Sequence, residues 1–347
     1  MSSYPFFRQL LFKLDPESAH QLTLRLIALA GVLAPIRSLL GLLFSYSSPD
    51  LTVNTFGLEF PNPLGLAAGY DKDGIGMHGL ACLGFGHIEL GTVTPLPQRG
   101  NPRPRIFRLP EDQALINRMG FPNSGAEALL HRLRRGRPGG VILGINIGKG
   151  IETPLEEAAQ DYLSLMRSFY PYGDYLAVNV SSPNTIGLRR LQAREHLERL
   201  LRSLVQERES LSTVSGHVVP LLVKLAPDLN DEELEDAVDV ILGSGLDGVI
   251  ATNTTIARDG LQSPLQSETG GLSGLPLRAL TKEIVARIYR LTDGKLPIIA
   301  VGGVFGPEDA RSLLDEGASL VQMYTGLIYR GPGVVKRILR QLSEGSN

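Results

Sequence analysis

Eight short apolar runs recur along this chain after residue 60, and their number constrains the fold more than any other feature. Buried parallel strands have nearly continuous apolar sequences, as these runs do. Most runs are followed by a stretch of helical character, and alternating strands and helices predict a parallel sheet. The runs cover residues 63–69, 87–93, 141–147, 175–180, 219–225, 248–252, 297–301 and 320–324. Eight such units predict an α/β fold, the TIM (β/α)8 barrel.

The segments between the runs are rich in glycine and proline, with 39 glycines and 23 prolines in the whole chain. Both residue types interrupt regular elements, so many tight loops are expected. Residues 100–115 contain proline and arginine in close alternation, which does not suit a barrel helix. We therefore expect an insertion after the second strand.

Charge and cysteine content argue against several classes of protein. The formal net charge is −2, so no global field favours nucleic acid. The single cysteine, Cys82, lies among apolar residues, which is typical of core packing, and one chain cannot form a disulfide with it alone. Neither a CxxC nor an HExxH motif occurs, so the sequence predicts no metal site.

Residues 1–46 differ from the rest of the chain. We expect a helix that begins at Pro16, with Asp15 as its N-cap, because proline suits the first helical position. Pro35 should end this helix, and a second, shorter helix is expected over residues 36–44.

This N-terminal segment is apolar, and its few charges are mostly basic. The uncharged run between Arg25 and Arg37 has 11 residues, whereas a membrane-spanning helix needs about 20. The segment is therefore not expected to span a membrane. Two interpretations stay open: a helical pair that lies on a membrane surface with its basic residues near anionic lipid, or a pair that only caps the barrel. No small-residue cleavage site indicates a signal peptide.

Polar residues that follow the eight runs indicate where the active site lies, because TIM-barrel sites form at the C-terminal ends of the strands. Asn and Thr predominate there, and these uncharged donors and acceptors suit an amide-rich heterocycle better than a simple anion. Gly302-Gly303 and Thr325-Gly326 follow the seventh and eighth runs. Barrels commonly bind phosphate at those loops through backbone N–H groups, so we expect a phosphorylated ligand.

Two lysines could place positive charge in this site. Taken alone, Lys72 and Lys224 are most simply read as solvated surface residues. Lys224 fits that interpretation poorly, since it lies inside the apolar run 219–225 and a buried lysine needs a partner. It is also a candidate Schiff-base lysine, which keeps an aldolase hypothesis open.

Ser182 is the strongest candidate for a base or nucleophile. No histidine or aspartate lies beside it in the sequence, so a Ser-His-Asp triad is not expected. A serine can still accept a proton if a relay passes it on, and Thr185 is close enough in sequence to take part. The alternative is an ordinary turn, because Ser, Pro and Asn all favour turns.

Long motifs follow one another along the chain at residues 14–20, 62–69, 91–95, 116–121, 179–185, 251–255 and 270–274. Together they resemble class 2 dihydroorotate dehydrogenase, the quinone-dependent enzyme of pyrimidine synthesis. The resemblance covers nearly the whole chain, and the order of the motifs is far more specific than any single one.

The resemblance implies a flavoprotein that oxidises (S)-dihydroorotate to orotate. A proton would pass from C5 to Ser182 and a hydride from C6 to FMN, which a membrane quinone then reoxidises. Phe121 and Thr185 resemble the residues that shape the exit of the proton. Class 1 relatives carry a cysteine as base, and the position of Cys82 outside every motif favours class 2.

The resemblance also implies which residues contact the substrate, the FMN and the quinone. The substrate contacts are Lys72, Asn117, Arg118, Met119, Gly120, Phe121, Asn179, Asn184, Asn253 and Thr254. The FMN contacts are Ala68, Gly69, Lys72, Thr92, Asn146, Asn179, Lys224, Thr252, Gly274, Gly303, Tyr324 and Thr325. The quinone-site residues are His20 and Arg108.

By the same resemblance, residues 1–46 form a helical tunnel for quinone and residues 47–347 form the FMN-binding barrel. We expect a monomer attached peripherally to the cytoplasmic side of a bacterial inner membrane, without nucleic acid. One departure is Pro122, where many relatives have asparagine, and Tyr70 is a milder variation. The competing hypotheses are a lysine-dependent aldolase and a non-enzymatic, membrane-associated binding protein.

Overall fold

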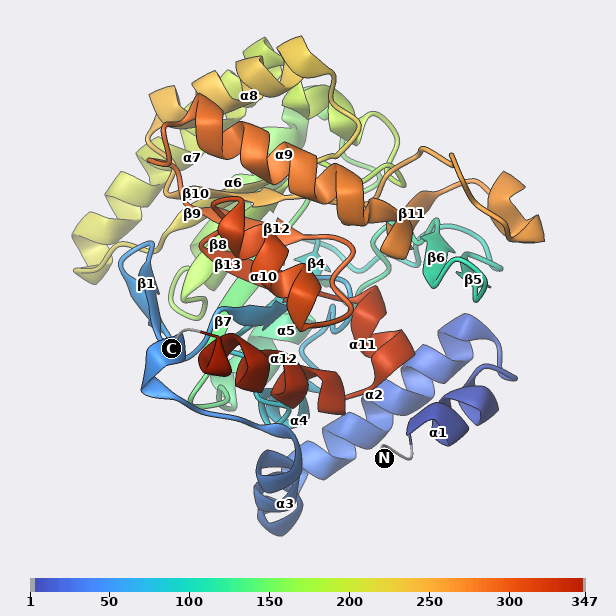
Figure 1. Ribbon diagram of the computed structural model, residues 1–347. Coiled ribbons are helices and arrows are strands. Elements are labelled where there is room, and N and C mark those ends of the chain that lie inside the picture. Colours follow the sequence, from blue (N-terminus) through green and yellow to red (C-terminus); the bar gives the residue numbers. More distant parts are fainter. Residues whose placement is uncertain (1–3, 346–347) are drawn as a thin grey trace.

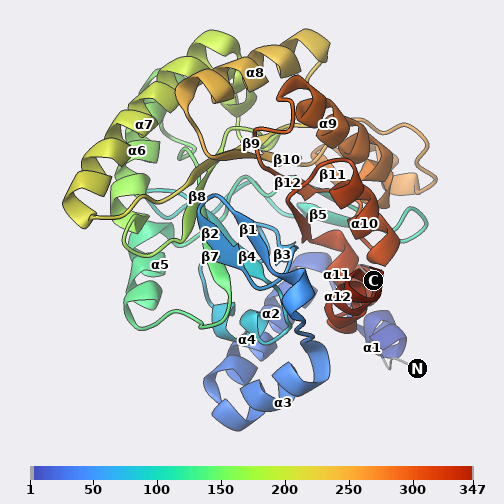
Figure 2. The ribbon, with the colours of Figure 1, turned by 60° about the vertical axis from the view of Figure 1, so that its left-hand side comes forward.

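A closed barrel of eight parallel strands forms the centre of the computed structural model, which describes residues 4–345 (Figures 1 and 2). Each strand lies within one of the eight predicted runs, so the barrel prediction is confirmed. Around the barrel the strands are β3 (Leu64–Leu66), β4 (His87–Val93), β7 (Ile142–Ile147), β8 (Tyr175–Asn179), β9 (Leu221–Leu225), β10 (Gly248–Ala251), β12 (Ile298–Val301) and β13 (Leu320–Met323). β13 pairs with β3 and closes the ring.

Helices surround the barrel on its outer side (Figure 2). They are α4 (Met77–Ala81), α5 (Gly125–Arg134), α6 (Ala158–Phe169), α7 (Arg194–Ser215), α8 (Asp231–Ser244), α9 (Arg278–Leu291), α10 (Pro307–Asp315), α11 (Thr325–Arg330) and α12 (Gly333–Glu344). Short 3₁₀ turns occur at Pro49–Leu51, Leu155–Glu157, Leu188–Gln192, Pro264–Ser267 and Leu275–Leu277.

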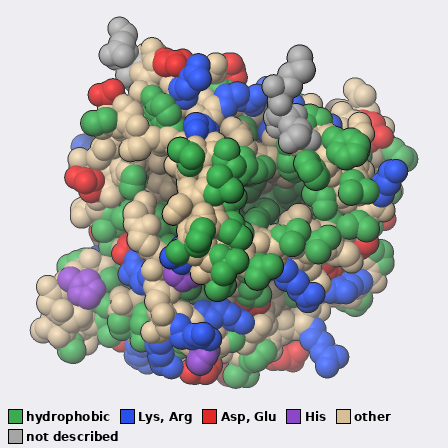
Figure 3. Space-filling view, turned by 90° about the horizontal axis from the view of Figure 1, so that it is seen from below, with side chains coloured by type: hydrophobic (Ala, Val, Ile, Leu, Met, Phe, Trp, Pro, Cys, Tyr) green, Lys and Arg blue, Asp and Glu red, His purple; other side chains and the backbone are tan. Residues whose placement is uncertain are grey.

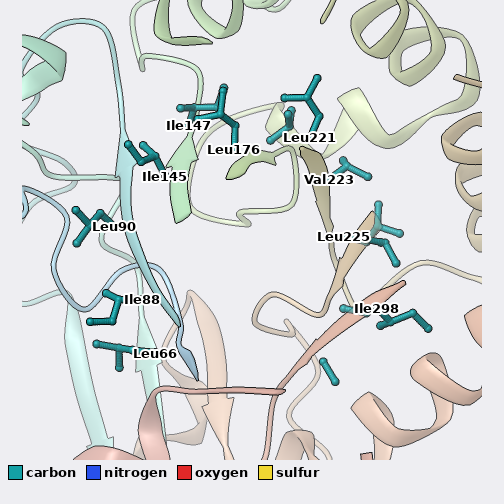
Figure 4. Packing of buried hydrophobic residues seen from close by; sticks show 14 of the residues in the cluster. Leu66, Ile88, Leu90, Ile145, Ile147, Leu176, Leu221, Val223, Leu225 and Ile298 are labelled. Atoms are coloured by element: carbon teal, nitrogen blue, oxygen red, sulfur yellow. The ribbon is translucent and has the colours of Figure 1, made fainter. Parts of the chain in front are cut away.

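Side chains of the barrel strands alternate between the helix layer and the barrel interior, as the pleat requires. Leu66, Ile88, Leu90, Val223 and Ile298 belong to the large apolar cluster that surrounds the strands (Figure 4). The apolar members of the interior form a separate cluster and come from the alternate positions. Alternation thereby also places the polar residues of β4, β9 and β13 inside the barrel.

A small antiparallel hairpin, β1 (Val53–Thr55) and β2 (Leu58–Phe60), covers the N-terminal end of the barrel. The ring of Phe60 packs edge-on against His87 at the start of β4, with 5.5 Å between their centroids. The interior is therefore sealed by aromatic residues at this end, which leaves the opposite end for ligands.

The predicted insertion over residues 100–115 is not a barrel helix, as expected, but it contains strands that the sequence analysis did not foresee. β5 (Ile106–Leu109) and β6 (Ala114–Asn117) form a hairpin. β6 also pairs with β11 (Gly271–Gly274), which gives a separate three-stranded antiparallel sheet. Pairing between segments so far apart in sequence leaves no local pattern by which to predict it.

The N-terminal segment forms three helices, α1 (Tyr4–Leu11), α2 (Pro16–Val32) and α3 (Ala34–Phe44), which lie together on one side of the barrel (Figure 1). The side chain of Asp15 accepts a hydrogen bond from the Ser18 N–H at 2.8 Å, which confirms the predicted N-cap. The expected role of Pro35 is wrong in part. It lies in the first turn of α3, where proline is tolerated because its missing N–H needs no partner, and α3 begins at Ala34.

No single helix among residues 4–345 is long and apolar enough to cross a membrane. α2 and α3 reach that length and composition only as a pair, with a bend of 113° between them.

A buried ion pair attaches α2 to the insertion. The carboxylate of Glu17 accepts hydrogen bonds from Arg105 at 2.7 and 3.0 Å and from Arg103 at 2.8 Å. Burial alone would raise the pKa of Glu17, but the two guanidinium groups hold this pKa below its usual value. Arg105 also donates to the backbone oxygens of Arg99 and Asn101. It therefore joins the helical segment to the insertion that covers the barrel mouth.

Replacing Arg105 with methionine should lower the free energy of unfolding by about 3 to 5 kcal/mol, since Glu17 then loses its buried partner. The matched variant Arg103→Met should cost less than about 1 kcal/mol, because the Arg103 side chain is 62% exposed. Urea unfolding of both variants measures the difference. Equal losses of unfolding free energy in the two variants would show that burial of the Glu17–Arg105 pair is unimportant.

Candidate active site

A large cavity opens at the C-terminal end of the barrel, between the strand ends and the three-stranded sheet. We call it the barrel cavity. It encloses about 1110 Å³ when counted to its open mouth. The residues that line it come from every barrel strand except β7, or from the loops that follow these strands. Others come from β5, β6 and β11. The sequence analysis expected the site at this end of the barrel.

Most of the predicted ligand contacts line the barrel cavity. They are Ala68, Gly69, Lys72, Thr92, Asn117, Met119, Gly120, Phe121, Asn179, Ser182, Asn184, Lys224, Thr252, Asn253, Thr254, Gly274, Gly303, Tyr324 and Thr325. The fold thus gathers residues separated by more than 250 positions in the sequence around one space.

Three of the residues predicted for the substrate, the FMN or the proton relay do not line the cavity. The guanidinium of Arg118 turns to Glu268, at 2.6 Å, and stacks on the ring of Phe107. Asn146 is fully buried behind the cavity wall. The Thr185 hydroxyl is buried and has no hydrogen-bond partner among residues 4–345, so no hydrogen bond joins it to Ser182.

The two adjacent serines after β8 face different surroundings. Ser182 lines the cavity, and its Oγ accepts a hydrogen bond from the Asn184 N–H at 3.3 Å. Ser181 is fully buried and does not line the cavity. Its Oγ donates to Asn179 Oδ1 at 3.2 Å and accepts from Asn253 Nδ2 at 2.9 Å. Ser182 is therefore the serine that a ligand can reach.

Amide and hydroxyl side chains form a continuous network in the wall beneath the cavity. Asn146 Oδ1 accepts from Thr92 Oγ1 at 2.5 Å and from Asn179 Nδ2 at 3.1 Å. Asn179 Oδ1 in turn accepts from the Ser181 N–H at 3.2 Å. Each amide is thereby held in one orientation, so the groups it presents to a ligand are preorganised.

Lys224 lies inside an apolar run and therefore needs a partner, and this partner is Glu89. Its Nζ lies 3.7 Å from Glu89 Oε1, and both side chains are almost fully buried. Glu89 also accepts from Gln322 Nε2 at 2.8 Å and from the Tyr175 hydroxyl at 3.2 Å. Sequence reasoning missed Glu89 and Gln322, although a polar residue inside an apolar run, the signal that identified Lys224, marks both of them.

Other cavity residues that the sequence analysis missed are mainly apolar: Ala67, Ile106, Leu115, Ser273, Leu277, Val301, Val304, Phe305 and Met323. Apolar residues on β5 and β6 carry no signal that distinguishes a ligand contact from core packing.

Lys72 supplies a second cation. Its Nζ donates to the Gly69 carbonyl at 2.7 Å, and it lines the cavity on the side of the first barrel loop. Burial lowers the pKa of Lys72 to about 8, so the ammonium is charged at pH 7. A carboxylate ligand therefore finds a positive charge in the cavity.

Glycines form the far wall of the cavity. A Cβ at Gly303 would lie 2.4 Å from the Arg278 Cα, and one at Gly326 would lie 2.0 Å from the Val304 oxygen. No side chain fits at either position. Gly303 lies in the loop after β12, and Gly326 lies in the first turn of α11. Backbone N–H groups in such loops suit an anion such as phosphate.

The loop after Phe121 is well anchored despite Pro122, which cannot donate a backbone hydrogen bond. Asn123 Nδ2 donates to the Phe121 carbonyl and to Thr94 Oγ1, both at 2.8 Å. Asn123 Oδ1 accepts from the Gly125 N–H at 2.8 Å. These contacts hold Phe121 against the cavity without any contribution from Pro122.

A second cavity, mainly apolar, lies between the N-terminal helices and the barrel, and we call it the extension cavity. His20, Arg108 and Tyr70 line it. Tyr324, together with Ile106 and Leu115, lines both cavities, so the two spaces share a wall. Burial, together with the charge of Lys72, lowers the pKa of His20 to about 4, so its ring is neutral at pH 7.

Comparison with known proteins gives one consistent result. The family model described as "Dihydroorotate dehydrogenase" matches residues 50–345. "Dihydroorotate dehydrogenase (quinone)" of Chromobacterium violaceum is 50% identical over 342 residues, which is 98% of each chain. The protein of the same name from Methylococcus capsulatus is 52% identical over 334 residues and covers 96% of each.

Solved structures agree. The crystal structure of ligand-free DHODH from Eimeria tenella is similar with a TM-score of 0.86 and 42% identity, and the similarity covers 94% of both chains. The structure of DHODH from the same organism in complex with ferulenol has a TM-score of 0.87, 41% identity and coverage of 94% of this chain and 90% of that chain.

The pKa of Lys72 is testable without any ligand, because only the neutral amine reacts with an acylating reagent. Labelling of Lys72 by acetic anhydride, followed by mass spectrometry, should rise with pH to half its maximum near pH 8. A labelling rate that still increases steeply at about pH 10, the ordinary lysine value, would contradict the assignment.

Proposed function

The chain belongs to the dihydroorotate dehydrogenase family and oxidises dihydroorotate with a quinone as acceptor in pyrimidine biosynthesis, and we propose that Ser182 is the base of this reaction. The observation that carries the proposal is the position of Ser182. Of the two adjacent serines after β8, it is the one that lines the barrel cavity. Family membership also argues against the aldolase and the non-enzymatic binding protein.

Enzymes of this family depend on FMN, and the barrel cavity fits such a group. The oxygen Gln322 Oε1 is buried without a partner among residues 4–345, and Gln322 lines the cavity, so an acceptor is free to meet a ligand. The glycine wall at Gly303 suits the phosphate, and Lys224 lies within the cavity. We assign the FMN contacts to the cavity residues Ala68, Gly69, Lys72, Thr92, Asn179, Lys224, Thr252, Gly274, Gly303, Tyr324 and Thr325, with Asn146 as support from behind the wall. When bound, FMN accepts the hydride that leaves C6 of the substrate.

The substrate would occupy the part of the cavity near Ser182. Its ring carries amide groups, which Asn117, Asn184 and Asn253 can match with donors and acceptors. Lys72 supplies the charge for the carboxylate. We assign Met119, Gly120, Phe121, Asn179 and Thr254 to the same site. Arg118 is assigned to support through its backbone, since its side chain is engaged with Glu268.

Ser182 would take the C5 proton of the substrate at its Oγ. The hydrogen bond that this oxygen accepts from the Asn184 N–H stabilises negative charge on it, which favours loss of its own proton. That proton must leave as the new one arrives. Thr185, whose buried hydroxyl has no partner among the described residues, is the proposed next acceptor, and Phe121, which lines the cavity, is the other residue that we assign to the exit of the proton.

We assign the extension cavity to the quinone. Its wall is mainly apolar, as a quinone ring and tail require, and His20 and Arg108 supply polar groups. Because Tyr324 lines both cavities, a quinone there would lie close to the cofactor. His20 is neutral at pH 7, so it can donate or accept a hydrogen bond without adding charge.

We further propose that residues 1–46 form the membrane-associating segment, of which the structure describes 4–46, and that residues 47–347 form the catalytic barrel. Hydrophobic side chains gather on the face where α1, α2 and α3 lie, with Lys and Arg around them (Figure 3). Such a face suits peripheral attachment to a membrane. We propose that the protein attaches in this way, as a monomer on the cytoplasmic side of a bacterial inner membrane.

Ser182→Ala should slow reduction of the bound flavin by dihydroorotate about 10²- to 10⁴-fold, because general-base catalysis contributes rate enhancements of that size. Anaerobic stopped-flow absorbance measures the rate, and the absorbance of the purified variant shows that FMN is retained. The matched variant is Ser181→Ala, which should lose less than about ten-fold, since Ser181 is not in the cavity. If Ser182→Ala reduces its flavin at the normal rate, the base is another group.

Membrane attachment is tested by changes on the apolar face. Leu39, Leu42 and Leu43 of α3 are 53%, 76% and 52% exposed, so replacing all three with serine should release the protein from phosphatidylethanolamine–phosphatidylglycerol vesicles in a sedimentation assay. The control is Val214→Ser in α7, an apolar residue that is 87% exposed and lies outside the N-terminal helices. Equal binding of the triple variant and the control would contradict attachment through α3.

A further inference from the structure

We propose that Glu89 is a positioning residue for the cofactor: it neutralises Lys224 beneath the barrel cavity and orients the amide network that lines it. Glu89 is not itself a lining residue, and its side chain is fully buried in the barrel interior. The inference rests on the proposed function, since it takes FMN to occupy the barrel cavity.

The surroundings of Glu89 identify it as a buried anion. Its two carboxylate oxygens receive hydrogen bonds from Asn146 Nδ2 at 2.8 Å, Gln322 Nε2 at 2.8 Å and the Tyr175 hydroxyl at 3.2 Å. Lys224 Nζ lies 3.7 Å from Oε1. Burial of a carboxylate without a cation and hydrogen bonds is very costly, so these contacts offset the burial of Glu89, with Lys224 as its counter-ion.

Lys224 is the member of this pair that reaches the cavity. It lines the barrel cavity, whereas Glu89 lies behind it. The side chains that contact Glu89 are otherwise neutral, so the net charge of the pair at the cavity is close to zero. Any cofactor bound there is therefore influenced by the sum of both charges, and a change in either one should be measurable on the cofactor.

Glu89 also determines which way Asn146 faces. A carboxylate only accepts hydrogen bonds, so Asn146 must turn its Nδ2 toward Glu89 and its Oδ1 toward Asn179. Asn179 must then present its Nδ2 to Asn146. The Oδ1 of Asn179 therefore faces Ser181 and Asn253, whose Nδ2 lies at 3.5 Å. One buried anion thus determines the orientation of amides that reach the cavity.

Glu89 orients Gln322 in the same way. Its Nε2 faces Glu89, so its Oε1 must face away, and that oxygen has no partner among residues 4–345. Gln322 lines the cavity, which makes the oxygen available to a bound group. Glu89 therefore acts through three cavity residues: Lys224, Gln322 and Asn179.

The experiment measures the two-electron midpoint potential of bound FMN in the holoenzyme by dye-coupled titration. Glu89→Gln leaves an unpaired cation and should favour the reduced flavin at least ten-fold, a shift of about +30 mV for a two-electron couple. Lys224→Met leaves an unpaired anion and should shift the potential in the opposite direction. The double variant Glu89→Gln/Lys224→Met removes both charges and should return close to the wild-type value.

Tyr175→Phe is the matched control, because it removes one hydrogen bond to Glu89 without changing any charge. The redox equilibrium of FMN bound to Tyr175→Phe should stay within three-fold of that of FMN bound to the wild type. If Glu89→Gln alone does not fold, Lys224→Met and the double variant still test the proposal. Adding Glu89→Gln to Lys224→Met must reverse the shift in potential that Lys224→Met causes. Shifts of the same sign in both single variants, or no shift beyond that of Tyr175→Phe, would overturn the proposal.

Two different results separate the role of Glu89 from the proposed function. A wild-type protein that binds no FMN, or holds FMN that dihydroorotate does not reduce, would refute the proposed function. A wild-type protein that is active, but whose potential does not respond to charge at Glu89, would refute only the role of Glu89.

Discussion

Closure of the barrel is the constraint on which the rest of this structure depends. When β13 pairs with β3, every second side chain of the eight strands must point into a space that has no exit at the N-terminal end. Apolar residues fill the lower part, and Phe60 and His87 seal it. Lys224 and Gln322, which alternation directs inward, are almost fully buried, and both pair with Glu89. The Lys224–Glu89 pair and its amide neighbours are the result, and they form the base of the cavity.

The second constraint is the attachment of the N-terminal helices to the barrel. Glu17 on α2 and Arg105 on the insertion form a buried pair, and Arg105 also bonds the backbone of Asn101. Asn101 Nδ2 in turn donates to the carbonyls of Arg118 and Asn184, at 3.0 and 3.2 Å. The helices that enclose the proposed quinone cavity and the loops that surround the proposed substrate site thus share one set of contacts. Two half-reactions on one cofactor require such fixed neighbouring sites.

The sequence predicted the barrel well because its strands are local patterns. Each apolar run is read within a few residues, and the expected place of the site follows from the fold alone. The insertion was predicted only as an interruption, because the pairing of β6 with β11 joins segments more than 150 residues apart. Lys224 was recognised as unusual, yet Glu89 was not, although it too is a charged residue inside an apolar run. The pairing of the two became visible only in the closed barrel. The resemblance to a family supplied the residue roles, while the side-chain directions of Arg118 and Thr185 required the structure.

We propose that one flavin in the barrel cavity takes electrons from dihydroorotate and passes them to a quinone on the side of the N-terminal helices. Anaerobic mixing of the full chain with dihydroorotate, followed by addition of ubiquinone or menaquinone, tests it most directly. We expect the absorbance of the oxidised flavin to disappear on the first addition and to return on the second. A flavin that stays oxidised with dihydroorotate, or that neither quinone reoxidises, would contradict it.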